Sequence, residues 1–434
     1  MRKILLSTLL VTCLCACSTS GTQEVAKGRM DRSRLNIGTY HLKPYACTEA
    51  HVKDLADCGI DFVVCMQDDK PTLDLFSKYG VGAVVTGVLP GWWGGDGDRA
   101  GTLSQVNPIS EYEKAAASWQ DHPAVWGIDI GDEPSALDFP YYGEVFTKVD
   151  SLFPEQFPYL NLYPNYASVS QNNAEQTVNQ LGTPTYSEHI AEYVKNVPSD
   201  YICYDFYVYS CNVPHAYDNL RIVADACRES DRSMWIVLQV NSHRPEVWVS
   251  ENELRFQAYT AMAFGAENII WACYTAGWWH NQVLDGNGEK TEQYDKLKKV
   301  NSEIRTLADS YMKYRRVLTS FVGFEGTPWL EGLDIKTSAT LDNGAFSEVC
   351  LTDGAPLVAG EMVERDGGKG AALFVCAADD PYDEAPAMHE IRFKTAGRKV
   401  VVTGTEGNIP VRKDKEGYYS FSLASSAGAL IETR

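Results

Sequence analysis

The feature that most constrains the fold is an alternation of short β-rich runs with longer stretches of helical period, which begins at Leu35. Such alternation is typical of a parallel sheet whose strands are joined by crossover helices. Eight strands are predicted, over residues 36–41, 61–66, 82–88, 125–130, 159–163, 201–207, 234–240 and 268–274. Eight is the number that closes a barrel, so the predicted fold is α/β, a (β/α)8 TIM barrel over residues 35–312.

Residues with helix-capping chemistry fall where the predicted helices should begin and end. Thr48 is suited to open the first helix, and Gly80 to end the second. Ser250 and Glu253 have the Ser-x-x-Glu spacing of a capping box, which predicts a helix that runs to about Phe264. These signals support the division into strand and helix units.

The hydrophobic period changes after about Arg316. Short alternating runs, such as residues 371–377, 399–403 and 418–423, are separated by Gly, Asp and Asn turns. A chain of 434 residues is long for one compact unit. We therefore expect a second domain, a small antiparallel β-sandwich over residues 316–434.

The N-terminus has the layout of a bacterial secretory signal, with Arg2 and Lys3 ahead of an apolar stretch. Residues 14–17, Leu-Cys-Ala-Cys, resemble the lipobox of bacterial lipoproteins, which implies a signal peptide over residues 1–17 and Cys17 as the lipid anchor. Residues 18–34 are polar and predict a flexible tether. The expected location is the bacterial cell envelope, on its periplasmic or cell-surface side. The alternative is an ordinary secreted protein, whose signal peptide is cleaved nearby without attachment of a lipid.

The charge and the cysteine content exclude some classes of binding partner. The net charge is -20 and the mature part has no basic run, which argues against nucleic acid. The nine cysteines after Cys17 are scattered, without CxxC pairs or metal-ligand spacing. We expect free buried thiols, with a disulfide still possible, and we predict neither a metal nor a cofactor.

The active site of a TIM barrel lies at the C-terminal ends of its strands. Side chains along a strand alternate between the two faces of the sheet, so this alternation, or strand parity, identifies the candidate catalytic residues that point inward there. On the fourth strand Trp126, Ile128 and Ile130 are expected to face the helices. Glu133 should then point into the mouth and Asp132 away from it. A carboxyl group partly buried among aromatic rings has a raised pKa, which suits Glu133 to act as a general acid.

The following strands send further polar groups toward the same mouth. Asp205 on the sixth strand is predicted to be the second carboxylate. Tyr163 and Asn165 after the fifth strand, Tyr207 after the sixth and Gln239 on the seventh are predicted to contact substrate. A purely structural barrel would be expected to carry apolar side chains at these positions.

Two tryptophan pairs lie in loops at this end of the barrel. Trp92 and Trp93 follow the third strand, and Trp278 and Trp279 follow the eighth. Aromatic faces left exposed in pairs indicate a binding surface, and sugar rings stack on such faces. All four residues are predicted to bind a carbohydrate substrate.

The segment Gly131-Asp132-Glu133-Pro134 resembles the end of the fourth strand in the clan of barrel glycoside hydrolases that includes families 5 and 42. Residues 253–266 and 269–271 are similar to uncharacterised barrel hydrolases of polysaccharide-degrading bacteria. The resemblance implies an acid/base role for Glu133. The clan's nucleophile, a Glu ending the seventh strand, is replaced here by Gln239.

The missing glutamate leaves the second catalytic group open. Asp205 is the best candidate, while Glu246 and Glu251 after the seventh strand are weaker ones. Asp132-Glu133 is also similar to the Asp-Glu pair of N-acetylhexosaminidases, in which the substrate's acetamido group attacks. The predicted function is a glycoside hydrolase acting on an oligo- or polysaccharide; the alternative is a lipid-anchored glycan-binding protein with an inactive barrel site.

Overall fold

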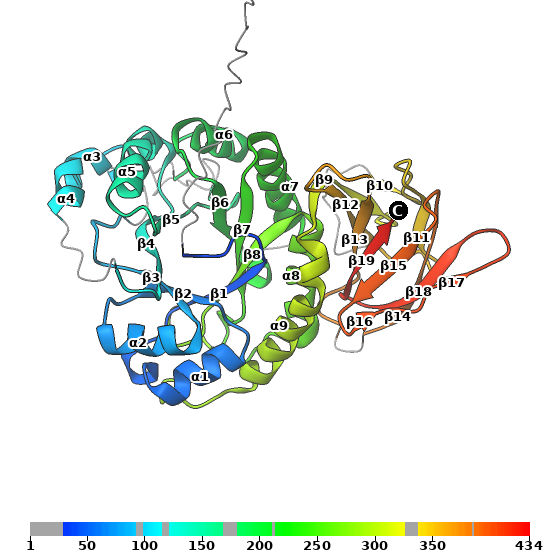
Figure 1. Cartoon of the computed structure of the whole chain (residues 1–434), viewed down its shortest axis with the longest axis horizontal. Coiled ribbons are helices and arrows are strands. Elements are labelled where there is room, and N and C mark those ends of the chain that lie inside the picture. Colours follow the sequence, from blue (N-terminus) through cyan, green and yellow to red (C-terminus); the bar gives the residue numbers. More distant parts are fainter. Residues whose placement is uncertain are drawn as a thin grey trace, which may run out of the picture.

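The computed structural model describes residues 29–92, 99–114, 121–167, 180–210, 213–325, 337–383 and 386–434. It consists of a barrel and a β-sandwich that pack side by side (Figure 1). The predicted anchor Cys17 and the predicted sugar-binding Trp93 lie outside the described residues. Within the described ranges no helix has both the length and the apolar content needed to cross a membrane.

The barrel sheet has eight parallel strands in the order β5-β4-β3-β2-β1-β8-β7-β6. They are β1 (Asn36–Tyr40), β2 (Phe62–Met66), β3 (Gly82–Val85), β4 (Val125–Asp132), β5 (Phe157–Asn161), β6 (Tyr201–Asp205), β7 (Ser233–Gln239) and β8 (Ala266–Ala272). A parallel bridge between Leu162 and Tyr204 joins the two ends of this sheet. The predicted TIM barrel is confirmed.

Helices surround the barrel strands (Figure 1). They are α1 (Glu49–Asp57), α2 (Lys70–Tyr79), α3 (Leu103–Val106), α4 (Ile109–Lys114), α5 (Phe139–Leu152), α6 (Tyr186–Asn196), α7 (Val213–Ser230), α8 (Glu251–Ala263) and α9 (Glu292–Tyr311). The predicted caps are present, because Thr48 accepts from His51 N and Ser250 forms the capping box with Glu253. Gly80 ends α2 in the left-handed conformation, with φ 71°.

The N-terminal end of the barrel is closed by residues expected to belong to the tether. Met30 is 2% exposed and packs in the barrel interior. The Arg32 guanidinium lies 5.2 Å from the ring centres of Phe157 and Trp235. The tether prediction is therefore wrong for residues 29–34, because apolar burial and cation–π contacts hold this segment against the barrel.

Strand β4 is irregular at two points. Its register with β3 shifts, so that Val125 pairs with Ala83 but Gly127 pairs with Val84. Its register with β5 shifts between Asp129 and Gly131. An extra residue at a bulge breaks the two-residue alternation of side chains. As a result Trp126, which was predicted to face the helices, packs against the interior cluster instead.

The second unit is an antiparallel sandwich, as predicted. One sheet has the order β10-β9-β12-β13-β19-β15-β16 and the other β11-β14-β18-β17. The strands are β9 (Tyr314–Val322), β10 (Thr337–Ser338), β11 (Phe346–Leu351), β12 (Leu357–Glu364), β13 (Ala371–Ala377), β14 (Met388–Thr395), β15 (Val400–Gly404), β16 (Gly407–Asn408), β17 (Arg412–Lys413), β18 (Tyr419–Ala424) and β19 (Gly428–Thr433). One strand pair, β9 with β10, is parallel.

The larger sheet packs on helices α8 and α9 of the barrel (Figure 1). A Cβ added at Gly360 would lie 2.2 Å from the carbonyl oxygen of Ala263, so the sheet approaches the end of α8 closely. Thr319 Oγ1 donates to the same carbonyl at 3.0 Å. Phe374 of β13 belongs to the apolar cluster of the barrel's helix layer. The two units therefore share a continuous apolar interface.

Candidate active site

Two carboxyl groups at the C-terminal end of the barrel are bridged by one amide. Asn161 Nδ2 donates to Asp132 Oδ1 at 3.1 Å and to Asp205 Oδ1 at 2.7 Å. These residues end the adjacent strands β4, β5 and β6. Because both oxygens bond the same nitrogen, they lie no more than about 6 Å apart. The geometry places Asp205 in the mouth, where the sequence predicted it.

The same surroundings give the two carboxyl groups different pKa values. Burial, followed by the charge of Asp205, raises the pKa of Asp132 to about 8, against the opposing hydrogen bond from Asn161. Burial also raises the pKa of Asp205, to about 6, while hydrogen bonds from Asn161 and Tyr166 oppose the rise. Near neutral pH Asp132 therefore holds a proton while Asp205 is ionised.

The inward position of Asp132 corrects the parity prediction. Ile130 belongs to the apolar cluster of the helix layer, and a Cβ at Gly131 would lie 2.2 Å from the Tyr142 hydroxyl of α5. Two consecutive residues thus face outward at the bulge, and Asp132 turns in. Gly131 is the residue that allows this close approach, and a glycine inside a strand was the one sequence signal of it.

Glu133 follows Asp132 at the rim of the mouth. Its backbone nitrogen donates to Asn161 O at 2.8 Å, so pairing with β5 persists to this residue. Its φ of 46° is left-handed, a conformation that costs free energy for a residue other than glycine. The side chain is half-buried.

The other carboxyl group of β4, that of Asp129, lies deeper in the barrel. Asp129 Oδ2 accepts from Thr86 Oγ1 at 2.9 Å and from Cys65 Sγ at 3.6 Å. Burial raises the pKa of Asp129 to about 6, although hydrogen bonds from Thr86, Gly131 and Cys65 oppose the rise. The sequence did not single out Asp129 as a functional residue.

Aromatic side chains from separate loops meet at the mouth. The Tyr207 ring lies 4.9 Å from that of Trp279 and 6.1 Å from that of Trp278. Trp278 also meets Tyr40 edge-on at 5.7 Å and His41 at 5.5 Å. Tyr207, Trp278 and Trp279 therefore form an aromatic rim at this end of the barrel, and their contact with a sugar stays a prediction.

His41 is a neutral group on this rim. Burial, helped by the charge of Lys43, lowers its pKa to about 4. Its Nδ1 is buried and has no hydrogen-bond partner among the described residues. A neutral imidazole in this position offers one donor and one acceptor to a hydroxyl group.

Other predicted sugar contacts lie elsewhere. Trp92 is 5% exposed, and the Arg99 guanidinium lies 4.6 Å from its ring centre, so this ring packs in the helix layer. Tyr163 is buried with its ring 6.4 Å from His189 of α6. Asn165 donates to His215 O at 2.9 Å at the start of α7. The parity prediction failed for Tyr163 and Asn165 because β5 ends at Asn161 and the chain turns away.

Gln239 is buried, with both ends of its amide engaged. Its Oε1 accepts from Tyr209 N at 3.2 Å, and its Nε2 donates to Asn241 O at 2.9 Å and to Ser210 Oγ at 3.3 Å. At 1% exposure it braces the loop after β6 and does not reach a ligand, contrary to the sequence prediction. Glu246 is exposed, and Glu251 is paired with Arg255 on α8.

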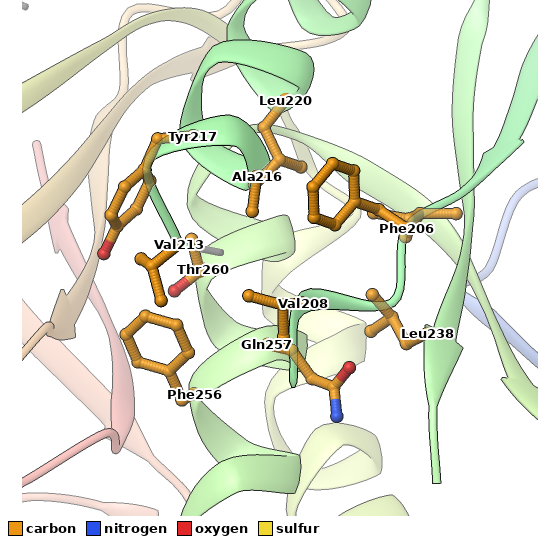
Figure 2. Close-up of a pocket in the computed structure, with 11 residues that line it drawn as sticks. Phe206, Val208, Val213, Ala216, Tyr217, Leu220, Leu238, Phe256, Gln257 and Thr260 are labelled. Atoms are coloured by element: carbon orange, nitrogen blue, oxygen red, sulfur yellow. The ribbon is translucent and has the colours of Figure 1, made fainter. Parts of the chain in front are cut away.

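A separate narrow apolar pocket lies among α7, α8 and the ends of β6 and β7; its empty space is about 360 Å³, including space open to solvent (Figure 2). Phe206, Tyr217 and Phe256 are among its lining residues, and Gln257 and Thr260 supply polar atoms. The Gln257 amide is already bonded to the backbone of Gln239. No carboxylate appears among these lining residues, so the cavity lacks the groups for acid–base chemistry.

Metal-ligating side chains do not gather anywhere in the described part of the chain. Over the described ranges, no group of three His, Cys, Asp or Glu residues is arranged to hold a metal ion. The eight cysteines described there are free thiols.

The fold and this site define a (β/α)8 barrel that carries buried and half-buried carboxyl groups at the C-terminal ends of its strands and is followed by a β-sandwich. No protein-family model matches the sequence, and the search of curated proteins found no relative. The chain is similar in structure to the cycloisomaltooligosaccharide glucanotransferase of Paenibacillus sp., with a TM-score of 0.54, 9% identity, and coverage of 93% of this chain and 85% of that one. This likeness shows a shared fold.

Two further solved structures have lower TM-scores. The glucosidase of Croceicoccus marinus has a TM-score of 0.43 at 12% identity, with 93% of this chain and 96% of that one covered. The glycoside hydrolase family 5 mannosidase of Rhizomucor miehei has a TM-score of 0.41 at 12% identity, with 64% and 93% covered.

Proposed function

We propose that this protein is a glycoside hydrolase that acts on an oligo- or polysaccharide. One observation carries the proposal: Asn161 bridges Asp132 and Asp205 at the barrel mouth, and the two carboxyl groups have unequal pKa values. Cleavage of a glycosidic bond needs an ionised carboxyl group and a proton donor. Asp205 supplies the first, and the second is either Glu133 at the rim or the protonated Asp132. Tyr207, Trp278 and Trp279 supply ring faces beside them on which a sugar stacks.

The proposed roles follow from these environments. Asp205 is ionised near neutral pH and acts as nucleophile or base. Glu133 donates the proton to the leaving oxygen; its left-handed backbone is the kind of strain that functional sites retain. Asp132, which holds its proton at neutral pH, donates a hydrogen bond to a substrate hydroxyl or acetamido group.

Turnover of a panel of glycans by the parent and by Glu133→Gln, Asp132→Asn and Asp205→Asn tests these roles. We expect Glu133→Gln and Asp205→Asn to lower kcat/KM by about a thousandfold. Aryl glycosides with a good leaving group need no protonation, so they should restore activity to Glu133→Gln but not to Asp205→Asn. If Asp132→Asn is the variant restored in this way, the donor is Asp132; full activity of Glu133→Gln contradicts the assignment.

A second function is a glycan-binding protein whose barrel no longer cleaves. The end of β7 favours it, because Gln239 is locked by protein groups and supplies no carboxylate there. Binding of a glycan by the parent without release of new reducing ends would establish this second function and refute the first.

For the N-terminus we propose export and lipid attachment at Cys17, on the strength of the lipobox-like sequence alone. Labelling with a radioactive fatty acid in a bacterial host, with Cys17→Ser as the control, tests this. The parent should carry label and the variant should not; equal labelling contradicts the anchor.

A further inference from the structure

A second hollow lies outside the barrel mouth, at the junction with the sandwich. Its volume is about 1010 Å³, including space open to solvent. It is bounded by the loop after β7, by the starts of α8 and α9 and by Pro386 of the sandwich. The lining residues are Trp248, Ser250, Glu251, Asn252, Arg255, Glu292, Lys296 and Pro386. None of them has a role in the proposed cleavage.

Trp248 presents an aromatic surface in this hollow. At 36% exposure it is the one tryptophan among the exposed large apolar residues of the described chain. Lys296 Nζ lies 5.9 Å from its ring centre and donates to Val249 O at 3.3 Å, which fixes the ammonium beside the indole. Exposed indole is unfavourable in water, and contact with the apolar face of a ligand removes that cost.

The charges around Trp248 are balanced. Glu251 Oε2 is 2.9 Å from Arg255 and 2.7 Å from Lys299. Arg255 also pairs with Glu303 at 2.7 Å, and Lys296 pairs with Glu292. Since each cation already faces a carboxylate, the hollow does not favour an ionic ligand of either sign.

Asn252 contributes a buried acceptor that no described group satisfies. Its Nδ2 donates to Asp383 O at 3.1 Å and to Pro381 O at 3.3 Å, both from the sandwich. Its Oδ1 has no partner in the described part of the chain, and the residue is 6% exposed. A buried acceptor without a donor is unfavourable, so a ligand hydroxyl that donates here would stabilise the site.

The loop that carries Trp248 is fixed to the barrel mouth. Ser242 and His280 exchange backbone hydrogen bonds of 2.9 and 2.8 Å. Asn281 Nδ2 donates to Val247 O at 2.6 Å, and the His243 ring lies 6.0 Å from that of Trp279. His243 and Trp248 are five positions apart in the sequence, so their backbones are separated by at most about 18 Å. A chain of a few sugar units therefore reaches from the aromatic rim to Trp248.

We propose that the hollow centred on Trp248 is a second binding position for a neutral polysaccharide, separate from the site of cleavage. The indole stacks on a sugar ring, Asn252 Oδ1 accepts from a hydroxyl group, and the paired charges bond further hydroxyls. The choice of a carbohydrate rests on the proposed function. The site itself is defined by Trp248 and Asn252.

Native gel electrophoresis through soluble polysaccharides tests the proposal. The probes are a mixed-linkage β-glucan, a xylan, a galactomannan and a dextran, with polygalacturonate as the acidic control. All proteins carry Asp205→Asn, so that the gel polymer is not cut. We expect a neutral polymer to retard this protein and Trp248→Ala to raise Kd about tenfold. Trp248→Phe should keep most of the retardation, and Leu318→Ala, an exposed apolar control on β9, all of it.

Turnover measured in proteins with an intact Asp205 separates the two sites. Trp248→Ala should leave kcat/KM for a short aryl glycoside unchanged and lower it for the polymer. The proposal is overturned if no neutral polymer retards the protein, or if Trp248→Ala is retarded as strongly as its parent. It is also overturned if Trp248→Ala lowers kcat/KM for the short aryl glycoside as much as for the polymer. Retardation that depends on Trp248 in a protein without turnover refutes hydrolysis but supports this binding site.

Discussion

Asp132 and Asp205 end two different strands of the barrel, and both accept a hydrogen bond from the same side-chain nitrogen, Nδ2 of Asn161. The bridge holds two carboxyl groups of unequal pKa within about 6 Å of each other. Like charges at such a separation are unfavourable in a buried site, so the proton retained by Asp132 is part of what makes the arrangement stable.

Asn161→Leu should move the acidic limb of the pH–rate profile to higher pH. The hydrogen bond from Asn161 lowers the pKa of both carboxyl groups, so its loss raises them and Asp205 becomes ionised only at higher pH. The profile of kcat/KM measures the shift. Asn287→Leu, an exposed position in the turn before α9, should leave the limb in place; an unmoved limb in Asn161→Leu would contradict the bridging role.

Asp132→Asn should stabilise the protein at alkaline pH. The folded pKa of Asp132 is about 8, against an ordinary value of 3.8. Its contribution is therefore complete below about pH 4 and is lost as the pH rises through 8. A neutral amide avoids that loss, and we expect a gain of about 1–3 kcal/mol near pH 9 relative to pH 4. Chemical denaturation at both pH values measures it, and equal effects at the two would refute the shift.

Gly131→Ala should disrupt the bulge of β4. The new Cβ would lie 2.2 Å from the Tyr142 hydroxyl and 2.8 Å from the Trp92 carbonyl oxygen. We expect a loss of about 2–4 kcal/mol in the free energy of unfolding, together with lower activity. Adding Tyr142→Phe should recover only part of the loss, because the contact with the backbone oxygen remains. If Gly131→Ala alone kept full stability, Gly131 would not be packed closely against Tyr142.

Gln239→Glu should not create the nucleophile that the end of β7 lacks. The amide Nε2 donates to Asn241 O and Ser210 Oγ, and a carboxylate there would face the Asn241 carbonyl oxygen without a donor. We expect a loss of about 1–3 kcal/mol in stability and no gain in kcat. Thermal unfolding and turnover measure the two effects, with Gln105→Glu, an exposed residue of α3, as the control. An increase in kcat would contradict this prediction, because it would show that a carboxylate at the end of β7 takes part in catalysis.

His389→Gln should destabilise the sandwich more at low pH than at high pH. Burial lowers the pKa of His389, but Asp353 at 2.7 Å and Asp379 at 3.2 Å outweigh it and raise the pKa above 6.5. The stabilisation is complete below pH 6.5 and is lost as the pH rises through the folded pKa. We expect a difference of about 1 kcal/mol between pH 5.5 and pH 9, measured by denaturant unfolding. Asp353→Asn should reduce that difference; no pH dependence would contradict the pairing.

The sequence by itself determined the architecture, because strand and helix periods, helix caps and glycine stops are local properties. Thr48, Gly80 and the Ser250–Glu253 box lie at helix ends as predicted. The inward side chain of Asp205 also followed from simple alternation, since β6 pairs with β7 without a register shift. Long regular helices and strands can be predicted because the residues that specify them are neighbours in the sequence.

Only the tertiary structure decided which of the remaining polar residues form the site. The bulge at Ile130 and Gly131 depends on pairing with β5 and on close packing against Tyr142, and it turned Asp132 into the mouth. Burial of Trp92 and bonding of Gln239 likewise depend on partners distant in sequence. Strand registers and pKa shifts arise from contacts between strands and loops that are far apart along the chain, so they cannot be predicted from a local sequence pattern.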